Sequence, residues 1–173
     1  MSMLIGCSGR KNSDSSTAQG ATNAEVTDQV SLEDFLPKQA QPKLPTMKVW
    51  LGAEELITEL ALTGQQQTAG MMFRTNMPEN TAMLFVHPMP RQASYWMKNC
   101  FVPLSIAYID TDGVILEIHD LHPHNTNSVV STATNVRFGL ETPQGWFQRH
   151  NVSTGAVVRT ERGSLAETFF RQK

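Results

Sequence analysis

The sequence predicts a mainly β fold, a compact sandwich or barrel with one or two short helices. Three observations support this prediction. The apolar runs are short, turn residues separate them, and several alternate between apolar and polar side chains at the two-residue period of a strand. Strands of this length and spacing are typical of an all-β domain. The runs cover residues 83–87, 93–97, 104–110, 114–121, 136–141 and 156–160.

Two further runs near the start of the folded region predict a β-hairpin. Residues 47–51 and 54–62 both alternate between apolar and polar side chains, and Gly52-Ala53 lies between them. Successive side chains of a strand point to opposite faces. We therefore expect the apolar residues of both runs to face one core.

A short helix is predicted over residues 65–72, because Thr63 is followed by Gln66 at the spacing of a capping box. Further along, Asp112-Gly113 lies between two β-branched runs. Both residue types tolerate the positive φ of a tight turn. This turn is expected to join two antiparallel strands.

Residues 144–151, which follow Pro143, predict a second short helix or a loop, with Trp146 and Phe147 packing inward. The β-rich core domain is expected to cover residues 46–163. Residues 164–173 are then a C-terminal tail.

Composition limits the classes of partner. The chain has 173 residues, of which 40% are hydrophobic and 17% charged, as expected for one soluble domain with a tail. Its 14 basic and 16 acidic side chains give a net charge of -2, so it lacks the basic field that attracts phosphate backbones. Nucleic acid is not an expected partner. No apolar run reaches the 18 or so residues that a membrane-spanning helix needs.

The first 45 residues are predicted to be a lipobox-like start and a disordered tether. Leu4-Ile5-Gly6-Cys7 resembles the lipobox of bacterial lipoproteins, in which the cysteine carries lipid, although only six residues precede Cys7. A chance match is the alternative. Residues 8–45 are rich in small and polar side chains and cannot bury enough apolar surface to fold. Within them, residues 30–36 are expected to form a transient helical turn, with Ser31 as a possible N-cap. The predicted localisation is the cell envelope, periplasmic or extracytoplasmic, with membrane attachment through the lipid only.

Several motifs of the core carry a family resemblance. They read Gly70-Met71-Met72-Phe73-Arg74, Met83-Leu84-Phe85, Tyr95-Trp96-Met97-Lys98-Asn99 and Pro103-Leu104-Ser105-Ile106-Ala107-Tyr108-Ile109-Asp110. In this order they resemble the bacterial and archaeal family called domain of unknown function 192. The resemblance covers nearly all of the core and none of the tail. It implies a compact β-rich sandwich of jelly-roll type with a small helical element, and it states no reaction.

The sequence departs from the family pattern at three positions. Ser105 stands where members usually carry aspartate, Cys100 where threonine is common, and Ala82 where glycine is usual. If that aspartate acted as a general acid or base, serine would not replace it at neutral pH. The departure disfavours acid–base catalysis.

A candidate binding cleft is predicted where polar residues of the family-like motifs converge at the ends of apolar strands, with Phe73 and Tyr95 as further walls. The candidate ligand-binding residues are Arg74, Trp96, Lys98, Asn99 and Glu141. Aromatic walls with a few fixed polar groups suit a sugar or another small polar molecule. The structural alternative is that Arg74 pairs with Glu141 and covers the core.

Cys100 is a second candidate, as a nucleophile activated by a nearby histidine and by Lys98. A lone cysteine beside a strand is more often a small buried apolar residue, which is the favoured interpretation here. The methionines in and beside the apolar motifs are likewise attributed to core packing.

A third candidate is a histidine segment, in which His119, His122 and His124 could ligate zinc or copper with Asp120 or His87. The spacing matches no established zinc signature, and the segment enters a polar loop. Solvated surface histidines are therefore favoured, and no metal or cofactor is predicted.

Motifs of the common enzyme classes, such as a P-loop, a serine-nucleophile elbow or a metalloprotease helix, are absent from the sequence. The leading hypothesis is a non-enzymatic envelope module, monomeric or weakly dimeric, that binds a small polar ligand, a glycan or a protein partner. The second is a small enzyme acting on an envelope component through Glu141, Lys98 and Arg74. The third is a metal-binding protein.

Overall fold

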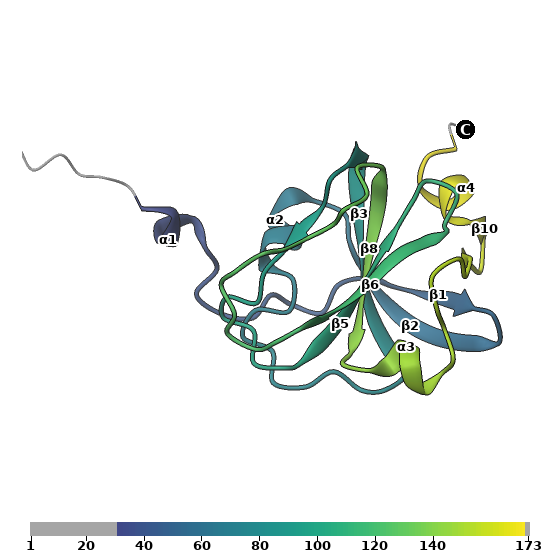
Figure 1. Cartoon of the computed structure of the whole chain (residues 1–173). Helices are drawn as coiled ribbons and strands as arrows, with labels where there is room; N and C mark the ends of the chain where they lie inside the picture. The colour runs from purple at the N-terminus through teal and green to yellow at the C-terminus, as the bar shows by residue number, and fades with distance from the viewer. Residues whose placement is uncertain (1–30, 172–173) are drawn as a thin grey trace, which may run out of the picture. The chain divides into compact units, whose positions relative to one another are not determined.

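The computed structural model describes residues 31–171 (Figure 1). Within this range the fold is mainly β, as predicted, with one eight-stranded mixed sheet, one two-stranded sheet and four short helices. Cys7 and residues 1–30 of the predicted tether lie outside the described residues. In the described part of the chain, no helix is long and apolar enough to span a membrane.

The large sheet has the strand order β10-β9-β1-β2-β3-β8-β5-β6, and β4 pairs with β7 in the small sheet. The helices are α1 (Leu32–Phe35), α2 (Gly64–Ala69), α3 (Trp146–Arg149) and α4 (Leu165–Phe169). The strands are β1 (Thr46–Leu51), β2 (Glu54–Ala61), β3 (Thr81–Arg91), β4 (Ser94–Tyr95), β5 (Leu104–Ile109), β6 (Ile115–Leu121), β7 (Val129–Val130), β8 (Val136–Pro143), β9 (Val158–Thr160) and β10 (Gly163–Ser164).

The predicted hairpin is confirmed, because β1 and β2 pair antiparallel. Gly52 has φ 64° at the turn between them, a conformation that glycine adopts without a steric penalty. Buried and exposed residues alternate along β1, as the sequence pattern predicted. The hairpin thus presents one apolar face to the core.

Helix α2 is confirmed with its cap. The Thr63 hydroxyl accepts from the backbone N–H of Gln66, and the Gln66 side chain accepts from the N–H of Thr63. The helix ends at Ala69, earlier than predicted, since Gly70 leaves the helical conformation with φ 42°. α2 lies in the connection between β2 and β3, which pair parallel, and a parallel pair requires such a crossover.

The predicted turn at Asp112-Gly113 is also confirmed. It joins β5 and β6, which pair antiparallel. The Asp110 carboxylate accepts from the backbone N–H groups of Asp112 and Val114, which fixes the turn. Gly113 has φ 85°, and a Cβ there would lie 2.8 Å from the Val158 carbonyl oxygen. The turn that precedes β6 therefore lies close to the first residue of β9.

The large sheet is buried on both faces. Along β3, Ala82 and Leu84 pack into one apolar cluster, while Met83 and Phe85 pack into another. The first cluster combines side chains of several strands with Trp146 and Phe147 of α3. The inward packing predicted for these two residues is therefore confirmed. The second cluster lies under α2 and the segment 92–102, and it surrounds the candidate site.

The ends of the folded region extend beyond the expected limits of 46 and 163. Residues 164–173, predicted as a tail, include α4, whose Leu165 is fully buried, and Ser164 caps it through a capping box with Glu167. On the other side, Leu36 and Leu44 are buried. Both belong to the second apolar cluster. A local sequence pattern does not indicate that isolated apolar residues of a polar segment pack into the core.

Candidate functional site

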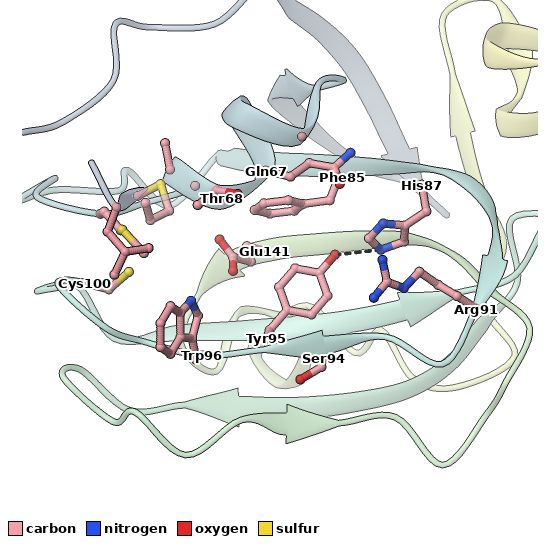
Figure 2. Close-up of a pocket in the computed structure, with 16 residues that line it drawn as sticks. Gln67, Thr68, Phe85, His87, Arg91, Ser94, Tyr95, Trp96, Cys100 and Glu141 are labelled. Carbon is pink, nitrogen blue, oxygen red and sulfur yellow. Dashed lines mark hydrogen bonds between the residues drawn. The ribbon is translucent and has the colours of Figure 1, made fainter. Parts of the chain in front are cut away.

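One cavity lies on the face of the sheet that carries the second apolar cluster, between α2, the last part of β3, β4 and β8. Its volume is about 430 Å³, within the usual range of ~300–1,000 Å³ for small-molecule sites. Figure 2 shows the side chains that line it. Glu141, Tyr95, His87, Arg91 and Trp96 are among the lining residues with polar or aromatic groups that could contact a ligand.

Glu141 is the central polar group of the cavity. It belongs to β8, is only 4% exposed, and its Oε2 atom is buried without a hydrogen-bond partner. Burial raises the pKa of this carboxyl to about 8, because the charged form loses its hydration. At neutral pH the group is therefore mostly protonated, and it can both donate and accept a hydrogen bond.

Tyr95 and His87 form a hydrogen-bonded pair beside Glu141, with 3.1 Å between Tyr95 Oη and His87 Nε2 (Figure 2). Burial, followed by the charges of Arg91 and Arg137, lowers the pKa of His87 to about 4. The imidazole is therefore neutral at pH 7. Its Nδ1 atom is buried and has no partner, so a second polar atom at this site is unsatisfied.

Gly139 makes room for the Tyr95 ring. It lies in β8, and a Cβ at this position would lie 2.7 Å from Tyr95 Cζ, well inside van der Waals contact. Phe85 holds the ring from the other side in an edge-to-face contact, with 5.1 Å between the centroids. A glycine inside a predicted strand is a signal of such a close approach.

Much of the remaining cavity wall is apolar, although Gln67, Thr68 and Ser94 also line it. Met71, Met72, Leu36 and Trp96 line it together with Cys100. Burial, and then the charge of Glu141, raises the pKa of the Cys100 thiol to about 12. The thiol stays protonated at neutral pH, which argues against the hypothesis of a nucleophile activated by Lys98.

Of the five predicted ligand-binding residues, Trp96 and Glu141 line the cavity together, while Arg74, Lys98 and Asn99 do not. Lys98 lies over the Trp96 ring, 5.7 Å from its centroid, and pairs with Glu33. Asn99 adopts φ 58°, and its carbonyl oxygen accepts from the N–H of Phe73. Lys98 therefore supports the Trp96 side of the cavity wall from outside, while Asn99 binds the backbone of Phe73, which does not line the cavity.

Arg74 does not pair with Glu141, so that alternative prediction is wrong. Its guanidinium donates to both carboxylate oxygens of Glu59, at 2.6 and 2.8 Å. Glu59 also accepts from the backbone N–H of Leu44. The pairing of β2 with β3 brings Glu59 close to the chain after α2, and both side chains line a separate cavity of about 240 Å³.

Replacing Arg74 with Ala is expected to lower the free energy of unfolding by about 2 kcal/mol, because Glu59 loses a two-pronged, charge-assisted partner while it stays mostly buried. Urea unfolding followed by fluorescence measures this change. Lys48→Ala is the matched control. It breaks an exposed ion pair with Glu55 and should change little. Equal effects of the two variants would contradict the prediction.

The histidine segment shows no metal site. Across residues 31–171, no group of three or more His, Cys, Asp or Glu side chains is arranged to hold a metal ion. His119 Nε2 lies 2.9 Å from Glu117 Oε2, and His122 and His124 are exposed. His87 lies at the cavity, beside Tyr95.

Ser105, which replaces the usual aspartate of the family pattern, has a structural role. It is buried, it donates to Asp120 Oδ1 at 2.6 Å, and it accepts from the N–H of Gly145 at 2.9 Å. The Ser105–Asp120 pair thereby fixes the start of α3. It does not line the cavity that contains Glu141.

Comparison with known proteins shows one family. Residues 48–160 match the family described as "Uncharacterized ACR", DUF192. A solved structure from Sinorhizobium meliloti 1021, named provisionally as a transcription regulator, is similar with a TM-score of 0.66 and 31% identity, over 70% of this chain and 98% of that one. A protein of unknown function from Novosphingobium aromaticivorans DSM 12444 has a TM-score of 0.64 and 26% identity, over 69% and 90% of the two chains. No curated protein matches this chain.

Proposed function

We propose that this chain, which belongs to the DUF192 family, is a non-enzymatic module that binds one small ligand in the cavity around Glu141. The ligand would have an apolar body and a group that exchanges hydrogen bonds with a neutral carboxyl. The proposal makes the protein a receptor or carrier of a small molecule.

One observation carries this proposal: the unpaired Oε2 atom of Glu141 in the wall of an accessible cavity. Leaving a buried polar group unsatisfied costs about 1–3 kcal/mol. A ligand with a hydroxyl or amide group would remove this cost on binding. Such an arrangement, a largely apolar pocket with few fixed polar groups, is typical of small-molecule sites.

The state of the neighbouring groups favours binding over catalysis. The Cys100 thiol is protonated, and burial raises the pKa of Tyr95 well above its usual value. Arg74 and Lys98, which would act with Glu141 in a small enzyme, are engaged by Glu59 and Glu33. The second hypothesis, an enzyme acting on an envelope component, therefore has less support from the geometry.

Two broader proposals accompany the first. The protein would be lipid-anchored at Cys7 and held in the cell envelope by its N-terminal segment, where an envelope protein or glycan is a possible further partner. Membrane fractionation of Cys7→Ser tests the anchor, and unchanged membrane association would exclude it. The domain itself would be a sandwich or barrel of jelly-roll type. The isolated antiparallel β-bridge between Val114 and Val157 supports this part of the proposal.

The binding proposal is tested by titrating 1-octanol into the full chain and following backbone amide shifts by NMR. We expect saturable shifts around Tyr95 and Glu141. Glu141→Gln should retain the binding, since an amide also donates and accepts, while Glu141→Leu should weaken it about tenfold.

Glu55→Gln, on an exposed carboxylate, is the control and should bind as the wild type does. Binding that is unchanged in Glu141→Leu, or shifts that map to another face, would refute the proposed site.

A further inference from the structure

We infer that the natural ligand is a monoanion with an apolar body, whose acid group binds Arg91 while its body lies against the methionine-lined part of the cavity. This inference rests on the proposed binding function and names its ligand class. It follows from how charge and apolar surface are distributed along the cavity.

The cavity has two chemically different ends. Figure 2 shows His87 and Arg91 at one end and Trp96 and Cys100 at the other, with Tyr95 between them. Both residues of the first end come from the last part of β3. The pairing of β3 with β8 shifts register between Val86 and Arg91. This irregularity bends the end of the strand, as a β-bulge does.

Arg91 is a cation available to a ligand. Its Nε donates to the carbonyl oxygen of Gln92 at 3.3 Å, and no carboxylate pairs with it among the ion pairs of residues 31–171. Arg137, next to the β8 residue Val136 that pairs with Arg91, does not line the cavity, and its guanidinium lies over the Phe170 ring, 3.7 Å from the centroid. A guanidinium with free N–H groups is suited to bind a carboxylate or phosphate in a two-pronged manner.

No other group of the cavity carries a charge that would compensate Arg91 at neutral pH. The other titratable lining groups are His87, Tyr95, Cys100 and Glu141. Burial shifts each of them towards its neutral form. The cavity thus has one formal positive charge at one end, which a single negative charge on a ligand would complement.

Apart from Glu141 and Thr68, the opposite end offers apolar or soft contacts (Figure 2). Met71 and Met72 are almost fully buried, and Leu36 and the Trp96 ring close the wall near them. Methionine side chains adapt to ligands of different shape. This end is therefore suited to an acyl or aryl group rather than to a second charge, which would lose its hydration without a partner.

Three probes with the same chain and different head groups test the inference: octanoate, 1-octanol and octylamine. Each is titrated into the full chain at pH 7 and constant ionic strength, with NMR shifts as the readout. We expect octanoate to bind about tenfold more tightly than 1-octanol, because its carboxylate forms a charge-assisted hydrogen bond with Arg91. Octylamine should bind most weakly.

Arg91→Gln should remove the preference for octanoate over 1-octanol. Arg162→Gln, which alters an exposed arginine that does not line the cavity, should alter neither affinity. Equal affinities of octanoate and 1-octanol for the wild type, or a preference that survives in Arg91→Gln, would overturn the inference.

The two proposals can fail separately. If 1-octanol binds and Glu141→Leu weakens that binding, the proposed function stands even where the anion preference is absent. If none of the three probes binds the wild type, both the ligand class and the proposed function are overturned.

Discussion

Replacing Glu141 with Gln is expected to raise the free energy of unfolding by about 3 kcal/mol at pH 7. Burial raises the pKa of this carboxyl from 4.5 to about 8 in the folded protein. The stability of the wild type is then fully present below pH 4.5 and is lost as the pH rises through 8, at about 1.4 kcal/mol per pH unit. An uncharged amide of the same shape avoids this loss.

Urea unfolding at pH 5, 6, 7 and 8 measures the effect. The advantage of Glu141→Gln over the wild type should grow at each step and level off above pH 8. A difference that stays constant with pH would show that Glu141 is not buried in its neutral form.

Glu117→Gln is a control with the opposite sign. Hydrogen bonds from Ala133, His119 and Thr132 outweigh burial and lower the pKa of Glu117 to about 2. The stability that Glu117 provides is present above pH 4.5 and is lost as the pH falls towards 2. This variant should therefore be less stable than the wild type at pH 7 and approach it in acid.

Replacing Gly139 with Ala is expected to destabilise the protein by about 2–3 kcal/mol and to close the cavity to ligands. The added methyl group would overlap the Tyr95 ring and lie 3.3 Å from Ile106 Cδ1. Tyr95 would have to move away from His87, and the ring that separates the two ends of the cavity would be displaced. Thermal unfolding and the 1-octanol titration measure both consequences.

Two comparisons isolate the cause. In a Tyr95→Leu background most of the cost of Gly139→Ala should disappear, because the clash is with the ring. Gly64→Ala should leave stability nearly unchanged, since a Cβ at Gly64 meets no atom within 4 Å. A Gly139→Ala variant as stable as the wild type would contradict the packing described for Tyr95.

Local features of the fold were predictable because they depend on neighbours in the sequence. Strand alternation located the β1–β2 hairpin, the capping box located α2, and Asp112-Gly113 located the β5–β6 turn. The parallel pairing of β2 with β3 was not predictable, since register between distant strands depends on packing across the whole sheet.

The site was predictable only in part for the same reason. Trp96 and Glu141 do share one cavity, but Arg74 finds Glu59 through the β2–β3 pairing. Arg91 lies in a proline-rich segment without a strand pattern, and the sequence suggests only a metal-ligand role for His87. The register shift in β3 that positions Arg91 leaves no local signal in the sequence.

The pairing of β1 with both β2 and β9 has a consequence for synthesis of the protein. β1 is translated before β2 to β8, and its second neighbour is β9, at residues 158–160. Until those residues are available, a nascent chain presents an open strand edge, the feature through which β-proteins aggregate. The sheet can therefore be completed only after β9 has been translated, and until then shielding of the growing chain by chaperones matters most for β1.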